Sequence, residues 1–355
     1  MSVEGNSRWR PAPGTGVASG QQDTPLRGRT GWLITDGKIG MDVQVKGVAD
    51  ALGLKSQFKH VAPRQPFRAL SPFGPVDPRE SFAKSGSPFA PPYPDIALAT
   101  GRLSIPYLRA LRRRAGPGTY CVVLQDPKTG PGVADLIWVP AHDSLRGHNV
   151  ITTPTSPHSF TPQRLADLRA TTPAAIAALP HPRITLILGG PGGGYSFDAA
   201  AERRLAASIA SLAPYAGSFL ITPSRRSPPS LVAAIDAATS ARPRILWDGA
   251  GDNPYPSFLA HADALVVTGD SVNMTGEACA TGRPVYVFEP GPASPKFARF
   301  HEALRRHGAT RPLPETMSRI DTWTYPPLDS AHEIAAEIER RWLRRKAVLP
   351  GLMPA

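Results

Sequence analysis

The feature that most constrains the fold of this chain is the stretch Leu265–Pro290, LVVTGDSVNMTGEACATGRPVYVFEP. Its apolar ends, Leu265–Thr268 and Val285–Phe288, are runs typical of strands that are covered on both faces. Between them, polar residues suited to capping precede a short helical segment that Gly282 ends. The pattern predicts strand, helix and parallel strand, the repeating unit of an open α/β sheet.

The turn after the first of these strands is a candidate ligand site. Open α/β sheets bind nucleotides and phosphates at the carboxyl ends of their strands, beside exposed helix N–H groups. A plain connector needs a single capping side chain, whereas this turn carries Asp270, Ser271, Asn273, Thr275 and Glu277. A simple connector remains the alternative, and it is sufficient to explain the fold.

The composition indicates a globular protein of two domains. The chain has 355 residues, of which 41% are hydrophobic, enough for a substantial core. Its 40 Lys and Arg residues against 28 Asp and Glu residues give a net charge of +12, so an acidic partner must be considered. Nucleotide phosphates and an anionic membrane surface both qualify, and a solvated surface is the alternative. No zinc-finger spacing or aromatic RNA-binding motif occurs, so we expect no specific nucleic-acid partner.

Cysteine usage and hydropathy predict the compartment. Cys121 and Cys279 lie in apolar runs outside any CxxC pattern, which indicates small core residues in a reducing environment. No apolar run is long enough for a transmembrane helix, and the N-terminus lacks the apolar core of a signal peptide. We therefore expect a cytoplasmic protein whose contact with the inner face of the membrane is at most peripheral. The arginine cluster Arg109–Arg114 fits such a surface or, alternatively, a solvated helix end.

The chain divides into a tail, two similar halves and a final helix. Residues 1–30 are polar and aperiodic, which predicts a disordered tail. We expect an N-terminal Rossmann-like domain over residues 31–180 and a C-terminal one over residues 181–325. Residues 326–355 contain an amphipathic helix that we expect to pack across both domains.

Each half opens with a strand that leads into a glycine-bearing turn. In the first half, Asp36, Gly37 and Gly40 follow the strand that begins at Trp32, before a helix expected from Val43. In the second half, GGPGGGYSFD follows the strand Ile184–Leu188, and its glycines allow backbone N–H groups to approach a phosphate. Neither turn has the spacing of a Walker loop or a dinucleotide fingerprint.

His142 and Asp143 are candidates for a general base. They follow the predicted strand Leu136–Val139, and both residue types accept protons in catalysis. The alternative is that they only cap and hydrogen-bond within a loop. No cluster of His, Cys and carboxylate residues has metal-ligand spacing, so no metal site is expected.

Several motifs carry a resemblance to a known family. The N-terminal half contains WLITDGKIGMDVQVKGVADALG, QDPK and VPAHD, and the C-terminal half contains ITPSRR, DNPY and FLAHADALVVTGDSVNMTGEACATGRPVYVFEP. In this order, over residues 31–325, they resemble the mitochondrial-fission-factor (elongated-mitochondria) family of GT-B-like glycosyltransferases. The resemblance implies an α/β, GT-B-like fold, with two facing Rossmann-like domains and a central cleft. Plant relatives are linked to recruiting a dynamin-like protein to mitochondria.

The resemblance also implies roles for individual residues. It implies that a nucleotide-sugar donor is held by Gly190, Gly192, Gly193, Arg225, Ser271, Asn273, Met274 and Glu277. Glu277 would bind the ribose hydroxyls of the donor, and Arg225 would neutralise its diphosphate. Asp36, Gly37 and Gly40 would lie over the acceptor or the diphosphate.

The expected function is sugar transfer from a nucleoside diphosphate donor to an unknown acceptor, such as an envelope glycan or a lipid. GT-B enzymes mostly act without a metal or another cofactor, because cations and helix N-termini stabilise the leaving diphosphate. An inverting enzyme would use a base such as His142 or Asp143. The alternative is a non-catalytic scaffold of the same fold that binds a protein partner or a membrane through its basic surfaces.

Overall fold

The computed structural model describes residues 24–84, 86–192, 195 and 197–348. Of the expected tail, residues 1–30, only residues 24–30 belong to the described part of the chain. Its last part is ordered, because Leu26 is fully buried and the first strand begins at Thr30.

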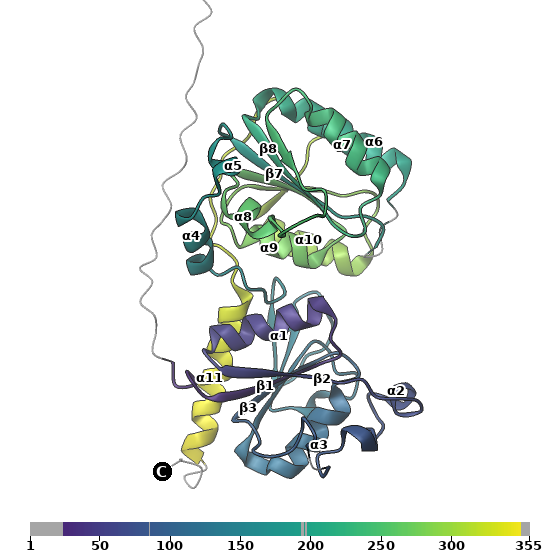
Figure 1. The fold of residues 1–355 in the computed structure, drawn as a ribbon, viewed down its shortest axis with the longest axis vertical. Helices are drawn as coiled ribbons and strands as arrows, with labels where there is room; N and C mark the ends of the chain where they lie inside the picture. The colour runs from purple at the N-terminus through teal and green to yellow at the C-terminus, as the bar shows by residue number, and fades with distance from the viewer. Residues whose placement is uncertain (1–23, 85, 193–194, 196, 349–355) are drawn as a thin grey trace, which may run out of the picture. The chain divides into compact units, whose positions relative to one another are not determined.

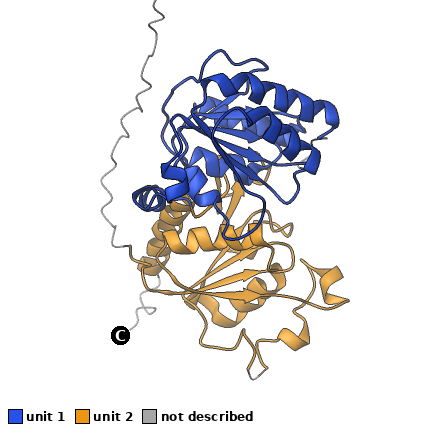
Figure 2. Ribbon diagram, turned by 45° about the horizontal axis from the view of Figure 1, so that its top comes forward, with its two compact units in different colours: residues 1–20, 160–328 blue, residues 21–159, 329–355 orange. Residues whose placement is uncertain are grey.

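The chain folds as two units, which differ from the expected domains at their boundaries (Figure 2). The C-terminal unit comprises residues 160–328, and the N-terminal unit comprises residues 21–159 together with 329–355. The boundary precedes the expected position near residue 180, because the Pro- and Ala-rich segment belongs to the C-terminal unit. There Leu165 is buried in the core, and Arg169 Nε donates to the Ala260 carbonyl at 2.8 Å.

The N-terminal unit is a six-stranded parallel sheet in the order β2-β1-β3-β4-β5-β6. Strands β1, β2 and β3 are labelled in Figure 1. Its strands are β1 (Thr30–Thr35), β2 (Lys55–His60), β3 (Ile96–Thr100), β4 (Tyr120–Leu124), β5 (Leu136–Pro140) and β6 (Val150–Thr153). Its helices are α1 (Ile39–Ala51), α2 (Phe67–Leu70), α3 (Ile105–Ala115) and α11 (Ser330–Val348), with short 3-10 turns η1 (Pro78–Glu80), η2 (Gly116–Gly118) and η3 (Pro131–Val133). Helices α1 and α11 enclose one core cluster of the sheet, and α3 encloses the other. Both faces are covered, as the apolar strand sequences predict.

The C-terminal unit repeats this architecture in the strand order β12-β11-β10-β7-β8-β9. Its strands are β7 (Arg183–Leu188), β8 (Ser218–Pro223), β9 (Arg244–Leu246), β10 (Ala264–Thr268), β11 (Val285–Phe288) and β12 (Thr310–Pro312). Its helices are α4 (Pro162–Ala170), α5 (Ala174–Ala177), α6 (Ala199–Leu212), α7 (Pro229–Thr239), α8 (Tyr255–Ala260), α9 (Val272–Cys279) and α10 (Pro295–Arg306), with the 3-10 turn η4 (Ala213–Tyr215). The predicted α/β class with two doubly wound sheets is confirmed.

The structure of the N-terminal unit differs from the sequence prediction at strand β2 and at the start of helix α1. Strand β2 is an edge strand in which Phe58 is exposed and Lys59 is buried, with its ammonium 4.8 Å from the Trp32 ring centroid. In most strands the apolar side chains are buried and the charged ones exposed, whereas here the reverse holds. The order of apolar and polar residues therefore does not predict this strand. Helix α1 also begins at Ile39, before the expected Val43.

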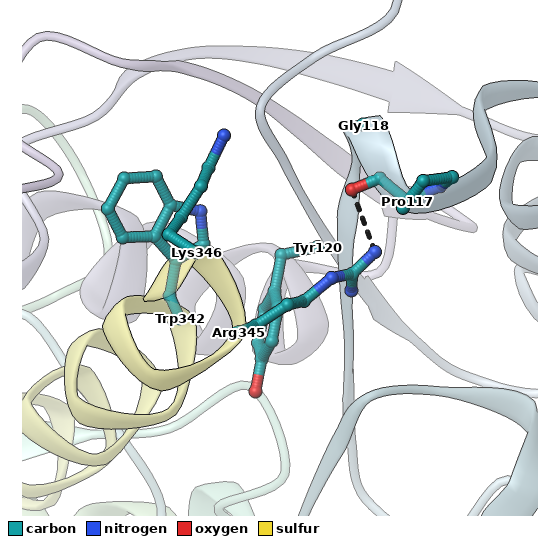
Figure 3. Close-up of a pocket in the computed structure, with 6 residues that line it drawn as sticks. All are labelled: Pro117, Gly118, Tyr120, Trp342, Arg345 and Lys346. Atoms are coloured by element: carbon teal, nitrogen blue, oxygen red, sulfur yellow. Dashed lines mark hydrogen bonds between the residues drawn. The ribbon is translucent and has the colours of Figure 1, made fainter. Parts of the chain in front are cut away.

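The final helix, α11, is part of the core of the N-terminal unit. Figure 3 shows Trp342 and Arg345, which project from this helix. Ile338 and Trp342 are buried there, in the same cluster as residues of α1. Arg345 Nη2 donates to the Pro117 carbonyl at 2.8 Å, and its guanidinium lies 5.6 Å from the Tyr120 ring centroid. A helix that was expected to pack across two domains is therefore a structural element of this unit.

Replacing Trp342 with alanine should destabilise the N-terminal unit. Removing a buried Trp side chain leaves a cavity, so the free energy of unfolding of this unit should fall by about 3 kcal/mol. The neighbouring Leu343 is 46% exposed, and Leu343→Ala is the matched control, with an expected change below about 0.5 kcal/mol. Denaturant unfolding monitored by tryptophan fluorescence measures both, and equal effects would contradict the assigned role of α11.

Candidate functional site

Each sheet has one point at which the strand order reverses. In the C-terminal unit β7 is followed by β8 on one side, and the chain later returns to place β10 on the other side. In the N-terminal unit β1 lies between β2 and β3 in the same way. Connections on the two sides diverge at such switch points, and open α/β sheets bind their ligands there.

At the switch point of the C-terminal unit, one ion pair with a buried carboxylate joins three loops. The Asp270 side chain after β10 is fully buried, and its Oδ2 lies 2.8 Å from Arg226 Nη2 in the loop after β8. The same oxygen accepts from the Gly190 N–H after β7, at 3.3 Å. Arg226 Nη1 in turn donates to the carbonyls of Gly190 and Pro191, each at 3.2 Å.

The close approach of these loops explains two of the glycines. A Cβ on Gly189 would lie 2.1 Å from Asp270 Oδ1, and one on Gly190 would lie 1.9 Å from the Arg226 carbonyl oxygen. Any side chain at either position would separate the loop after β7 from Asp270 and Arg226. Gly190, which was expected to face a phosphate, and its neighbour Gly189 thus also allow the loop after β7 to pack directly against the ion pair.

Three buried polar atoms around this switch point have no hydrogen-bond partner within the described part of the chain. They are Asp270 Oδ1, the Tyr195 hydroxyl and His301 Nδ1. His301, on α10, donates from Nε2 to the Gly269 carbonyl at 2.9 Å, and its ring lies 6.5 Å from that of Tyr195. Burial lowers the pKa of His301, so Nδ1 presents a lone pair, and burial raises the pKa of Tyr195, so its hydroxyl keeps its proton.

Helix α9 begins at the same switch point. Ser271 is its N-cap, and the Ser271 hydroxyl accepts from the Met274 N–H at 3.3 Å. Asn273 is exposed in the first turn, whereas the Met274 side chain packs against the core. The positive end of the α9 dipole is therefore directed to the edge of the sheet where an anionic ligand would lie.

Glu277 lies two turns further along α9. Its Oε2 accepts from the Tyr255 hydroxyl at 2.6 Å. Burial raises the pKa of Glu277 to about 7, against the opposing effect of the Tyr255 hydrogen bond and the charge of Arg164. The carboxyl group is thus partly protonated at neutral pH.

The remaining predicted donor residues have different settings. Arg225 is exposed, and no hydrogen bond or ion pair involves it within the described residues. Gly192 lies against Arg226, whose Nη1 would be 2.3 Å from an added Cβ. Gly193 lies outside the described residues.

The switch point of the N-terminal unit carries carboxylates. Asp36 follows β1, and its Oδ2 pairs with Lys38 Nζ at 2.5 Å, while its buried Oδ1 has no partner among the described residues. Gly37 adopts φ 76°, a conformation that favours glycine, and Gly40 lies in the first turn of α1. The predicted turn from Asp36 to Gly40 therefore extends only to Lys38.

The predicted bases, His142 and Asp143, lie in the loop after β5. In the strand order β5 is separated from the switch strands β1 and β3 by β4. His142 is buried, and the Asp143 N–H donates to the Pro140 carbonyl at 2.9 Å. They lie at the carboxyl edge of the sheet, away from its switch point.

The sequence analysis did not select Arg226, Tyr195, Tyr255 or His301 for this site. His301 lies on α10, a helix without a sequence prediction, although Phe300 and Leu304 have the spacing of one helical face. Arg226 is adjacent to the chosen Arg225, and only the contact with Asp270 distinguishes them.

Neither a metal-binding cluster nor a membrane-spanning helix occurs among the described residues. No group of three or more His, Cys, Asp or Glu side chains is arranged to hold a metal ion there. Of the helices in the same ranges, none is long and apolar enough to cross a membrane.

A family model matches most of the chain. The family is described as Mitochondrial fission ELM1, and the match covers residues 39–342. The Mitochondrial fission protein ELM1 of Arabidopsis thaliana is 29% identical over 292 residues, which are 75% of this chain and 66% of that protein. An uncharacterised protein of Rickettsia prowazekii is 32% identical over 126 residues, 34% of this chain and 35% of that protein. The matches thus span less than two thirds of either relative.

A solved structure shares the fold. The UDP-GlcNAc 2-epimerase of Methanocaldococcus jannaschii matches 88% of this chain and 99% of its own, with a TM-score of 0.51 and 8% identity. MurG of Acinetobacter baumannii matches 90% of this chain and 93% of its own, with a TM-score of 0.45 and 15% identity. The GT-B-like fold class is confirmed, and at these identities the likeness concerns the fold alone.

The raised pKa of Glu277 predicts a pH-dependent stability. The carboxyl of Glu277 binds its proton more tightly in the folded protein than in the unfolded chain, where its pKa is near 4.5. The free energy of unfolding should therefore fall as pH rises from about 4.5 to about 7. The loss should be at most about 3 kcal/mol. In Glu277→Gln, which keeps an acceptor for Tyr255, this loss should be absent.

Denaturant unfolding of both proteins at pH about 5 and about 8 measures the difference. Glu315→Gln, at an exposed glutamate of the same unit, is the control and should follow the wild type. If Glu277→Gln and the wild type lose stability in parallel as pH rises, another group is responsible.

Proposed function

The chain belongs to the Mitochondrial fission ELM1 family, and from this premise we propose that its C-terminal unit binds a nucleoside diphosphate sugar at the β7–β10 switch point. We further propose that the protein transfers the sugar to an acceptor. The observation that carries the proposal is the set of three buried polar atoms without partners, on Asp270, Tyr195 and His301.

Such unpartnered atoms are costly. Each buried polar group without a hydrogen bond destabilises a protein by about 1–3 kcal/mol, so three of them at one switch point support our proposal of a ligand that supplies the missing partners. Asp270 Oδ1 and His301 Nδ1 are acceptors that suit sugar hydroxyls, and the Tyr195 hydroxyl is a donor that suits a phosphate oxygen. A ligand with both hydroxyl and phosphate groups fits this combination.

The diphosphate would be bound by positive charge. The N-terminus of α9, with Ser271 and Asn273, supplies a helix dipole and backbone N–H groups. Arg225 is exposed and has no carboxylate partner among the described residues, so its guanidinium is available for bidentate contact. In this proposal Glu277 accepts from the ribose hydroxyls, and the leaving diphosphate is stabilised without a cofactor.

Transfer with inversion would need a base from the N-terminal unit. We favour Asp36 over His142 and Asp143, because Asp36 lies at the switch point and has an unpartnered oxygen. It would accept the proton of the acceptor hydroxyl, while the paired Lys38 keeps its other oxygen oriented.

The alternative is a non-catalytic scaffold, and one observation favours it. The Tyr255 hydroxyl already occupies an oxygen of Glu277, and its raised pKa weakens the carboxylate as a ribose acceptor at neutral pH. The Arabidopsis relative is also named for mitochondrial fission and not for a transfer reaction. In this case the fold would serve to bind a partner protein or a membrane in the cytoplasm.

Thermal unfolding with UDP-, GDP-, ADP- and CMP-sugars tests donor binding. A ligand that binds only the folded state at about 100 times its Kd adds about 2.7 kcal/mol of stability and raises Tm. One nucleotide class should stabilise the wild type and Arg203→Gln, at an exposed arginine on α6, but not Arg225→Gln. Glu277→Ala should also lose the effect. If no nucleotide raises Tm, donor binding is excluded.

A second measurement separates transfer from binding alone. With water as acceptor, an active enzyme should release the nucleoside diphosphate slowly from the stabilising donor. Asp36→Asn should abolish this release and keep the increase in Tm, because Asp36 lies on the other unit from the donor site. Binding without any release would favour the scaffold.

A further inference from the structure

A second polar site lies on the N-terminal unit. An open pocket of about 420 Å³ is lined by Arg109, Arg112, Arg113, Thr129, Gly132 and Val133. We propose that this pocket binds a phosphate-bearing anion. The inference does not depend on the proposed donor site, which belongs to the other unit.

The pocket is separate from the switch point of its own sheet. Helix α3 starts at the carboxyl end of β3 and runs back towards the start of β4. Arg109 lies near the middle of this helix, and Arg112 and Arg113 lie in its last turn, away from the edge where Asp36 lies. A ligand bound at the carboxyl edge of the sheet therefore does not explain why these arginines cluster.

The spacing of the three arginines concentrates charge. Arg112 and Arg113 follow Arg109 by three and four residues, so all three share one face of α3, where like charges repel. The C-terminal end of a helix favours cations, but this partial charge compensates only a fraction of three full charges.

Neutral acceptors fix two of these guanidinium groups. Arg109 Nη2 donates to the carbonyls of Phe73 and Gly74, at 2.7 and 2.6 Å. Arg112 Nη1 donates to the Gly132 carbonyl, and its Nη2 lies 3.3 Å from Asp135 Oδ1. Carbonyl groups orient a guanidinium without cancelling its charge, so other N–H donors of the fork stay available.

Carboxylates neutralise little of this charge. Asp135 is shared between Arg112 and Arg345, whose Nη1 lies 2.9 Å from its Oδ2. The Arg113 side chain is exposed, and its guanidinium makes no hydrogen bond or ion pair within the described part of the chain. The pocket therefore keeps a net positive charge, with at least one unpaired guanidinium at its wall.

Thr129 provides an independent sign of a ligand. Thr129 is one of the residues that line the pocket, and its buried Oγ1 has no hydrogen-bond partner among the described residues. A hydroxyl beside guanidinium groups is a usual donor to a phosphate oxygen. The volume falls within the range of small-molecule sites, which leaves room for an organic group attached to the phosphate.

Two sources can supply this chemistry. The phosphate is carried either by a lipid headgroup, which would hold the unit against an anionic membrane, or by a free phosphorylated metabolite. Both present the same group to the arginines. The two sources are distinguished by offering the phosphate group to the protein first on a soluble molecule and then on vesicles.

The first experiment titrates the full chain with glycerol 3-phosphate by calorimetry. Arg113→Gln should weaken binding at least about tenfold, as expected for the loss of a charge-assisted contact. Arg114→Gln is the control, because Arg114 lies on the same helix but outside the pocket lining, with its guanidinium 5.1 Å from the Phe82 ring centroid. It removes the same charge and should change the affinity less than about twofold.

The second experiment measures co-sedimentation with phosphatidylcholine vesicles, with and without phosphatidic acid. Binding that needs phosphatidic acid, is lost in Arg113→Gln and is kept in Arg114→Gln would identify a membrane-borne phosphate. Binding of glycerol 3-phosphate without vesicle binding would identify a free one.

Two results would overturn the proposal. Equal weakening by the two substitutions would mean that only net charge matters, and absence of binding in both experiments would exclude the site. Arg113 has no described partner to lose, so Arg113→Gln should keep the Tm of the wild type, and a loss of binding can be assigned to the pocket.

Discussion

The ion pair between Asp270 and Arg226 is the interaction on which the C-terminal switch point depends. A carboxylate whose side chain is fully buried is destabilising unless a cation and hydrogen bonds compensate it. Here one guanidinium does so, and the same guanidinium also holds the carbonyls of the glycine loop. The loops after β7, β8 and β10 therefore take their mutual positions from one contact, and the Gly189 and Gly190 backbones fit only while it is formed.

The two units share a topology and differ in the chemistry of their ligand edges. The C-terminal edge combines a helix N-terminus, an unpaired arginine and buried acceptors, a set suited to phosphate and hydroxyl groups. The N-terminal edge has Asp36 paired with Lys38, and Asp42 bound by Thr35 and His60. Carboxylates repel a diphosphate and accept protons, so this edge suits an acceptor hydroxyl better than a second nucleotide. The two sheets, which share one topology, therefore differ in the charge of the side chains at their ligand edges.

Local patterns predicted most of the fold, whereas long-range contacts determined what was missed. Buried parallel strands such as β10 and β11 are continuous apolar runs, and a capping residue, Ser271, precedes a helix as predicted. Thr275 and Glu277, which were expected in the turn, lie on α9. The choice between Arg225 and Arg226 could not be made, because it depends on Asp270, which is distant in sequence. Likewise, β2 is specified by pairing with β1 and not by its own alternation. The domain boundary moved because small Ala and Leu residues in α4 and α5 resemble a linker until their packing is known.

The position of α11 has a consequence for the order of folding during synthesis. The C-terminal unit is one continuous segment, and all of its strands have been made once residue 312 has left the ribosome. The N-terminal unit is discontinuous, since Ile334, Ile338 and Trp342 complete a core whose strands end at residue 153. Domains generally fold as units while the chain emerges. The half that is made first is therefore completed last, and until then its unfilled apolar face is a surface that chaperones would bind.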